Sequence, residues 1–480
     1  MNALKIFSLH LLACKKAKYI FIFFLVLSWS TLFLLATFEY PGDQYSYIFF
    51  SLIFLALLLS GLFSKVSYGY TFLSVMLWLG FWLKATLHLL FKYDYVEPIG
   101  QFNGSGDEWD NILLVASCGV IGVLAARYFY NFANKNQSTL IIETPPLPPT
   151  FYKKLKLPLW IILISSIIIL SVINIYFSFQ QIGIVPKTII WPLNAIFSWL
   201  MSTGFAMAIA TLLWWEFSLA KANIYIVLLS LFEATFSSIS LLSRGLFVFH
   251  IIPIFMATFL NRKLTKNLNL KSSALILICA LALYAATFPL VNSIRDYHYS
   301  GLVQKPSINF EISLFKNSIL KLSKFSVDRW IGLEGLMATS AYKQKDRTLF
   351  LSVLTEKVEI GKTTQFQNIA NSDYRFSDSE KFLFASLPGP ISLFYLSGST
   401  LIVISCMFLI TYTVLVSELI VHKIFSNAFL TALWASIIST AVAQMGINVP
   451  GLLFYFFLCS LGLFAIYLSQ KIHFPRKQFH

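Results

Sequence analysis

Apolar blocks of about twenty residues recur along this chain from Tyr19 to Ser469, and no other feature constrains its fold as strongly. A block of that length crosses the roughly 30 Å of bilayer hydrocarbon as an α-helix. Barrel strands would be about ten residues long and would alternate apolar and polar side chains, which these blocks do not do. Only 12% of the residues are charged, against roughly 25% in soluble domains. The sequence therefore predicts an all-α, polytopic membrane protein.

About twelve spans are expected. The run 224–260 is divided because one continuous helix of that length would measure about 55 Å, nearly twice the hydrocarbon thickness. Ser243, Arg244 and Gly245 interrupt it, so we expect a tight helical hairpin there, with a short second arm. The expected spans are 19–38, 47–63, 71–91, 112–132, 157–179, 189–214, 224–242, 246–260, 272–294, 399–419, 427–447 and 452–469.

The distribution of lysine and arginine predicts the orientation, because cytoplasmic loops of membrane proteins are enriched in both. The basic clusters all fall on one side of a twelve-span chain, whereas the first two loops on the other side are acidic. Both termini are therefore expected in the cytoplasm. The net charge of +15 is then a topology signal that favours membrane lipids, and no nucleic acid, as partners. The clusters are Lys15, Lys16, Lys18; Lys153, Lys154, Lys156; Arg262, Lys263, Lys266, Lys271; and Lys471, Arg476, Lys477.

Two segments are expected to lie outside the membrane. One is a cytoplasmic loop with a stiff Pro-rich spacer, and the other is an outer loop too long to lack a function. Periodic pieces at 308–325 and 331–342 predict a small helical cap in the outer loop. Its apolar end at 382–397 either lies in the interface or dips back into the membrane. The expected order is N-terminal spans at 1–132, the Pro-rich loop at 133–156, central spans at 157–294, the large outer loop at 295–398, and C-terminal spans with a basic tail at 399–480.

Familiar catalytic motifs are absent from the sequence. It has no Cys-x-x-C, His-Glu-x-x-His, P-loop or Gly-x-Gly-x-x-Gly pattern, which argues against a metal site and against ATP-driven chemistry. We expect no metal and no cofactor. Any chemistry would come from polar side chains that face a cavity near the outer membrane surface.

Charged residues within spans are the first candidates, because a charge in lipid is costly and usually has a role. Glu233 and Arg244 are eleven residues apart, which on one helix returns both to nearly the same face. Arg244 either snorkels to the interface or binds an anion in an outward cavity. Lys84 and His88, spaced i and i+4, share a face and either hold the bundle together or line the same cavity.

A second group of candidates follows the span at 272–294. Arg295, Asp296 and His298 place a cation, a carboxylate and an imidazole within four residues, suited to hold a diphosphate and accept a proton from a sugar hydroxyl. An ordinary interfacial anchor would look similar. Further on, the segment 328–335 mixes Arg329 and Glu334 with an aromatic residue and glycines. It is either a sugar-binding surface or a packed helix.

The span count, the cytoplasmic N-terminus, the Leu-Ser-Arg-Gly turn at 242–245 and one large outer loop after Arg295 together resemble bacterial O-antigen polymerases of the Wzy type. The resemblance is one of overall plan and extends over the whole chain. It implies a GT-C-like glycosyltransferase in the bacterial inner membrane that polymerises undecaprenyl-diphosphate-linked repeat units on the periplasmic face. A polysaccharide chain-length regulator is a candidate partner.

Carried over from this resemblance, Arg244, Arg295 and Arg329 would bind the substrate diphosphate, and Asp296, His298 or Glu334 would be the base. Lys84, His88 and Glu233 would line the cavity. O-antigen ligases share this plan, but they typically carry paired histidines in the large loop, where this chain has only His298. A lipid-linked oligosaccharide flippase is the alternative from another class. Transporters are commonly built from repeated halves, and no repeat is evident here.

Overall fold

The structure is a computed structural model. It describes residues 22–63, 67–134, 147–187, 189–219, 224–261, 270–299, 330–359, 362–373, 381–383, 387–445 and 448–471. Within these ranges the chain is almost entirely helical, and the strands are one short pair. The predicted all-α class is therefore confirmed.

Nine helical segments are long and apolar enough to cross a membrane among the described residues, and each coincides with an expected span. They support a multi-pass membrane protein. The segments are Ile22–Glu39; α2, Gln44–Phe63; Tyr68–Phe91, comprising α3 (Tyr68–Leu77), η1 (Trp78–Leu83) and α4 (Lys84–Phe91); α5, Gly106–Ala133; α6, Thr150–Phe177; Leu193–Ser218, comprising α7 (Leu193–Trp199), η2 (Leu200–Gly204) and α8 (Phe205–Ser218); Ala274–Arg295 within α11 (Leu270–Tyr299); α17, Thr400–Phe425; and α19, Val449–Lys471.

Three shorter apolar helices occupy the remaining expected positions. They are α9 (Ile224–Ser240), α10 (Leu246–Leu260) and α18 (Ala428–Ala443). The predicted hairpin is present, since α9 and α10 are separated by a tight turn in which Leu242 has a φ of +53°. Whether these three cross the membrane fully stays a prediction, because each is shorter than about twenty residues.

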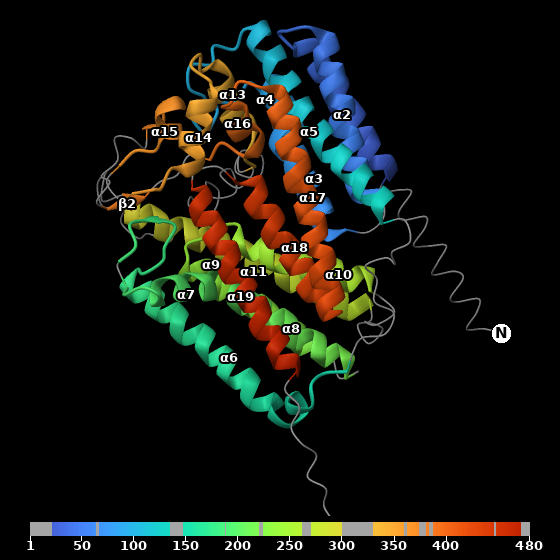
Figure 1. Cartoon of the computed structure of the whole chain (residues 1–480). Helices are drawn as coiled ribbons and strands as arrows, with labels where there is room; N and C mark the ends of the chain where they lie inside the picture. The colour runs from blue at the N-terminus through green and yellow to red at the C-terminus, as the bar shows by residue number, and fades with distance from the viewer. Residues whose placement is uncertain are drawn as a thin grey trace, which may run out of the picture.

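Two C-terminal helices, α17 and α18, pack against N-terminal helices that are far apart from them in sequence. Helix α17 lies along α5, and α18 lies along α3 and also contacts α10 and α8 (Figure 1). The N-terminal helices α3 and α5 and the central helices α8 and α10 are therefore joined by α17 and α18. One apolar core runs through all of these elements.

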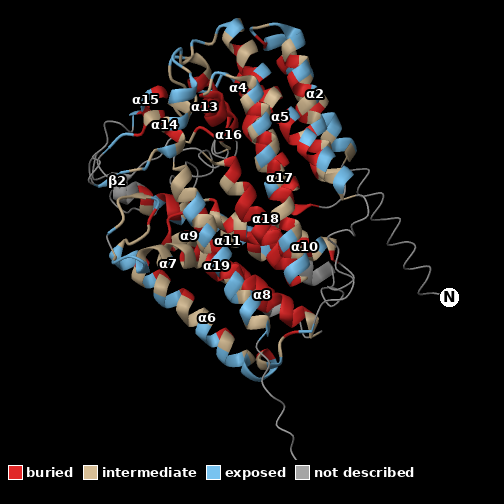
Figure 2. Cartoon of the chain, in the orientation of Figure 1, coloured by how far each residue is buried: buried red, intermediate tan, exposed pale blue. Residues whose placement is uncertain are grey.

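The outer faces of the helices are strongly apolar. Helix α6 exposes much of its length, and α19 is largely exposed as well (Figure 2). Such a surface would promote aggregation in water, but it matches the hydrocarbon of a bilayer. Exposed apolar side chains include Ile161, Ile162 and Ile169 on α6 and Leu453, Phe457 and Phe464 on α19.

The described part of the large outer loop forms short helices that gather beside α4 and α5 at one end of the molecule (Figure 1). They are α13 (Leu333–Ala341), α14 (Arg347–Thr355), α15 (Gln365–Ile369) and α16 (Pro390–Tyr395). Helix α13 confirms the periodic piece predicted at 331–342, whereas the piece at 308–325 lies outside the described residues. Every residue of α16 is buried, against α13, α5 and α17. Strand β2 (Phe382–Leu383) pairs antiparallel with β1 (Gly183–Ile184), which ties the loop to the central spans.

Candidate functional site

Buried charged residues gather at separate places in the bundle. We call Lys84, His88, Tyr95 and Glu334 the Lys84 cluster, and Ser202, Glu233, Ser237 and His250 the Glu233 cluster. Both contain residues that the sequence analysis selected, and each lies beside a short π-helical segment, η1 or η2. Such segments are rare and occur frequently at functional sites.

The Lys84 cluster is built around an ion pair between a membrane span and the outer loop. The ammonium nitrogen of Lys84 lies 2.7 Å from each carboxylate oxygen of Glu334. The two side chains are 0% and 2% exposed. Glu334 belongs to the first turn of α13, where a carboxylate is also favoured by the helix dipole. The pair therefore attaches α13 to α4.

Two glycines allow the loop to approach this closely. A Cβ added at Gly80, within η1, would overlap the carbonyl oxygen of Ile331. Gly332 has a φ of +152°, and a Cβ there would overlap the ring of Phe81. Larger residues at either position would hold α13 away from the span, and Glu334 with it.

His88 and Tyr95 complete the Lys84 cluster. The His88 ring stacks on Tyr95 with a centroid distance of 4.4 Å, and its Nδ1 lies 3.0 Å from the carbonyl oxygen of Tyr93. Burial raises the pKa of Tyr95, and the nearby Glu334 carboxylate raises it further. Tyr95 is thus a neutral hydroxyl at neutral pH. The i, i+4 pair Lys84 and His88 does share one buried face, as the sequence predicted.

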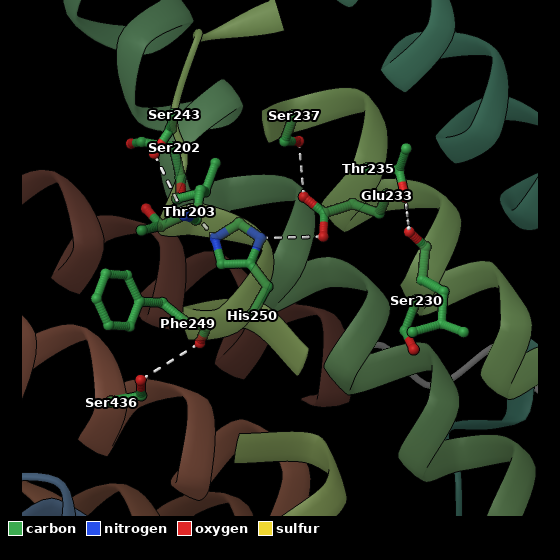
Figure 3. A network of polar contacts seen from close by, with 12 residues as sticks. Ser202, Thr203, Ser230, Glu233, Thr235, Ser237, Ser243, Phe249, His250 and Ser436 are labelled. Carbon is green, nitrogen blue, oxygen red and sulfur yellow. Dashed lines mark hydrogen bonds and ion pairs between the residues drawn. The ribbon is translucent and has the colours of Figure 1, made fainter. Parts of the chain in front are cut away.

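The Glu233 cluster joins three helices in the centre of the bundle (Figure 3). His250 of α10 places its Nδ1 3.1 Å from a carboxylate oxygen of Glu233, and the hydroxyl of Ser237 donates to the other oxygen at 2.8 Å. The Nε2 of His250 lies 2.9 Å from the carbonyl oxygen of Ser202 in η2. Because a carbonyl oxygen can only accept a hydrogen bond, the Nε2 of His250 carries a proton and donates to Ser202. A proton can then lie on either side of the contact with Glu233 without disturbing the other bonds.

Arg244 does not share a helical face with Glu233. The sequence argument extended the helix through position 244, but α9 ends at Ser240, and the left-handed residue Leu242 redirects the chain before Arg244. The helical periodicity that would align the two side chains therefore stops too early. Arg244 is half-buried in the turn before α10, and Glu233 is instead held by His250.

Arg295 lies at the same end of the bundle as the turn with Arg244. Its guanidinium Nη2 is 3.5 Å from the carbonyl oxygen of Ile182, and the amide of Ile182 donates to the carbonyl of Leu241 at 3.0 Å. Leu241 is three residues before Arg244. We call Arg244 and Arg295 the arginine pair. Arg295 is 8% exposed, whereas Arg244 is half-buried, so only Arg295 is largely shielded from solvent.

The other candidates of the outer segment are only partly described. Asp296 and His298 belong to the last turn of α11, which continues to Tyr299, but their side chains lie outside the described residues. Arg329 lies outside them altogether. Glu334 belongs to a packed helix, since the residues Leu333–Thr339 are all buried. The alternative of an exposed sugar-binding surface at 330–335 does not fit that burial.

Two buried carboxylates were not selected from the sequence. Glu418 of α17 accepts hydrogen bonds from the Ser67 hydroxyl and from two amides in the first turn of α3. Glu216 of α8 accepts from Tyr152 and, at 2.6 Å, from Lys156. The rule that selected Glu233, a carboxylate inside an expected span, would have found Glu418 within 399–419, whereas Glu216 lies just beyond the span expected at 189–214. Their partners, however, cannot be read from local spacing.

We expect Glu418 to stabilise the fold, and to have no part in chemistry. Replacing it with alanine should lower the free energy of unfolding by about 2–3 kcal/mol, because an N-terminal cap of α3 and the electrostatic partner of Arg127 are lost together. Glu418→Gln keeps one acceptor and should lose less. The measurement is denaturant unfolding of the purified protein in detergent. Equal losses for the two variants would contradict this role.

No family model, curated protein or solved structure matches this chain. Among the described residues, no group of three or more His, Cys, Asp or Glu side chains could hold a metal ion.

Proposed function

We propose that this protein polymerises undecaprenyl-diphosphate-linked oligosaccharide repeat units into a surface polysaccharide, as a glycosyltransferase of the bacterial inner membrane. The observation that carries the proposal is the arginine pair. Two arginines far apart in sequence are drawn to one end of the bundle through Ile182, which contacts Arg295 and is bonded to Leu241 beside the turn of Arg244.

The chemistry of glycosyl transfer explains why such a pair would be useful. The leaving group is a diphosphate, and negative charge develops on it as the glycosidic bond breaks. Preorganised guanidinium groups in a dry site stabilise that charge strongly, and their planar fork matches phosphate oxygens. In this proposal Arg244 and Arg295 hold the diphosphate on the periplasmic face, and the termini are cytoplasmic.

Of the three candidates for the base that takes a proton from the acceptor sugar, Glu334 fits least well. Glu334 is buried and both of its carboxylate oxygens accept from Lys84, so a sugar hydroxyl would have to enter the packed contact between α13 and α4 to reach it. Asp296 and His298 follow Arg295 within one helical turn and are the better candidates. The Lys84 cluster then serves to hold α13 against the spans.

The experiment that tests the proposal is the length distribution of surface polysaccharide from cells that lack this protein. A polymerase predicts that single repeat units remain on the lipid A core and that the ladder of longer chains disappears. Long lipid-linked chains that accumulate without attachment would indicate a ligase. An unchanged pattern would contradict all functions of this group.

A flippase is the second candidate, favoured by the Glu233 cluster. Buried ionisable pairs between helices are typical of proton-coupled transporters, and the contact between Glu233 and His250 can hold a proton on either partner. This reading predicts that deletion traps single lipid-linked units on the cytoplasmic face. It also predicts that Glu233→Gln abolishes translocation in reconstituted vesicles, whereas a polymerase would retain its transfer activity in that variant.

A further inference from the structure

An open pocket of about 410 Å³ lies between the first turns of α6 and helix α9, at the end of the bundle opposite the arginine pair. It is independent of the proposed transfer site. Its lining combines two kinds of side chain, three lysines and three apolar residues: Lys153, Lys154, Lys156, Leu157, Trp160 and Leu229. On the expected topology this is the cytoplasmic face of the membrane.

Of the three lysines, Lys156 is positioned by buried groups behind it. Glu216, which is 0% exposed, accepts a hydrogen bond from Lys156 at 2.6 Å and another from the hydroxyl of Tyr152. The indole of Trp160 donates to the same hydroxyl at 3.0 Å. Helix α6 is also distorted at Leu155, where φ and ψ are −107° and 17°. Lys153 and Lys154 remain exposed, so the pocket keeps an excess of positive charge.

An apolar stripe leads away from the pocket along the outside of α6. Leu157, Ile161, Ile168 and Val172 are 70%, 54%, 37% and 55% exposed. Their spacing places all four on one face of the helix. If the lysines bind the headgroup phosphate of a lipid, an acyl chain of the same lipid can therefore lie along this stripe. A free phosphate would make no use of that stripe.

We propose that this pocket binds one anionic phospholipid, with its phosphate on Lys153 and Lys154 and an acyl chain along the stripe from Leu157 to Val172. Lysines near an anionic membrane surface each add about fivefold to affinity at physiological ionic strength. Trp160 suits the boundary between headgroup and hydrocarbon, since its ring is apolar and its N–H is bonded to Tyr152.

The test is native mass spectrometry of the full-length protein in neutral detergent, titrated with phosphatidylglycerol or with phosphatidylcholine. We expect the parent protein to retain phosphatidylglycerol in preference to phosphatidylcholine. The double variant Lys153→Gln/Lys154→Gln should bind phosphatidylglycerol about thirtyfold more weakly, and its thermal unfolding without lipid should be unchanged because both residues are exposed. The matched control is Lys423→Gln/Lys471→Gln, which removes the same charge from exposed positions at the ends of α17 and α19.

Three results would overturn the proposal. They are equal retention of the two lipids by the parent protein, unchanged affinity in the Lys153/Lys154 double variant, and an equal loss in the control. A further titration adds inorganic phosphate as a competitor of the lipid. We expect it to displace little lipid at equal concentration, and efficient displacement would show a soluble-phosphate site instead. None of these outcomes depends on polysaccharide synthesis, so failure here is distinguishable from failure of the proposed function.

Discussion

Replacing Lys84 with methionine is expected to lower the free energy of unfolding by about 3–5 kcal/mol. The substitution keeps the approximate length and volume of the side chain but removes the ammonium group that lies 2.7 Å from both oxygens of Glu334. A buried carboxylate that loses its partner keeps its full desolvation cost, which is why breaking one side of such a pair is so destabilising. Glu334→Leu should have an effect of similar size.

The double variant Lys84→Met/Glu334→Leu distinguishes this explanation from simple loss of packing. Because neither partner of this ion pair is then left buried without the other, it should recover most of the stability lost in either single variant. The exposed pair of Lys362 and Glu359, 2.6 Å apart with side chains 74% and 58% exposed, is the control. Lys362→Met should leave the denaturant midpoint nearly unchanged, because solvent screens an exposed pair.

Unfolding in detergent with increasing denaturant measures all four variants, and limited proteolysis near 330–345 reports whether α13 has detached. The double-mutant cycle should give a large coupling energy between Lys84 and Glu334. A cycle with no coupling, or a Lys84→Met protein as stable as the parent, would rule out the ion pair as the anchor of α13.

The spans could be predicted from the sequence because the bilayer imposes one physical requirement, about twenty apolar residues in a helix, on each of them. The turn between α9 and α10 could also be predicted from the sequence. A polar break in an apolar run too long for one span is explained most simply by two helices joined by a turn. Helix α13 followed from the periodicity of its buried residues. Each of these features is encoded within a short window of sequence.

The contacts between segments distant in sequence could not be predicted from such short windows. Lys84 and Glu334 are 250 residues apart, and the i, i+4 rule could only place Lys84 beside His88. The packing of α17 against α5 has no local signal, because both surfaces are simply apolar. The π-helical segments η1 and η2 also have no recognisable sequence pattern, although they create the approach of Ile331 at Gly80 and provide the Ser202 carbonyl to His250.

The arginine pair could be predicted from the sequence only in part. The sequence selected Arg244 and Arg295 by their positions at the ends of spans, but it aligned Arg244 with Glu233 on a helix that in fact ends at Ser240. What connects the two arginines is the stretch at 181–185, which pairs with the outer loop through β1 and β2 and bonds to Leu241. That stretch has no charged residue to attract notice.

Conservative substitution of the pair is the second large effect that we expect. Arg244→Lys and Arg295→Lys should each reduce the rate of repeat-unit transfer by about 10²–10³-fold, and the double variant should abolish the polymer ladder. Lysine retains the positive charge but replaces a planar fork of donors with a single ammonium, which cannot bind two oxygens of a diphosphate in the same geometry. The loss should therefore appear in the rate of transfer and only slightly in protein abundance.

The measurement is polymer length and yield in cells that carry each variant, normalised to the amount of protein in the membrane. Arg347→Lys is the matched control, because Arg347 is exposed in the first turn of α14 and belongs to the same outer segment. Its ladder should match that of the parent. Normal ladders in both Arg→Lys variants of the pair would mean that a point charge is sufficient at these positions. The arginine pair would then be an interfacial anchor, and the diphosphate would have to bind elsewhere.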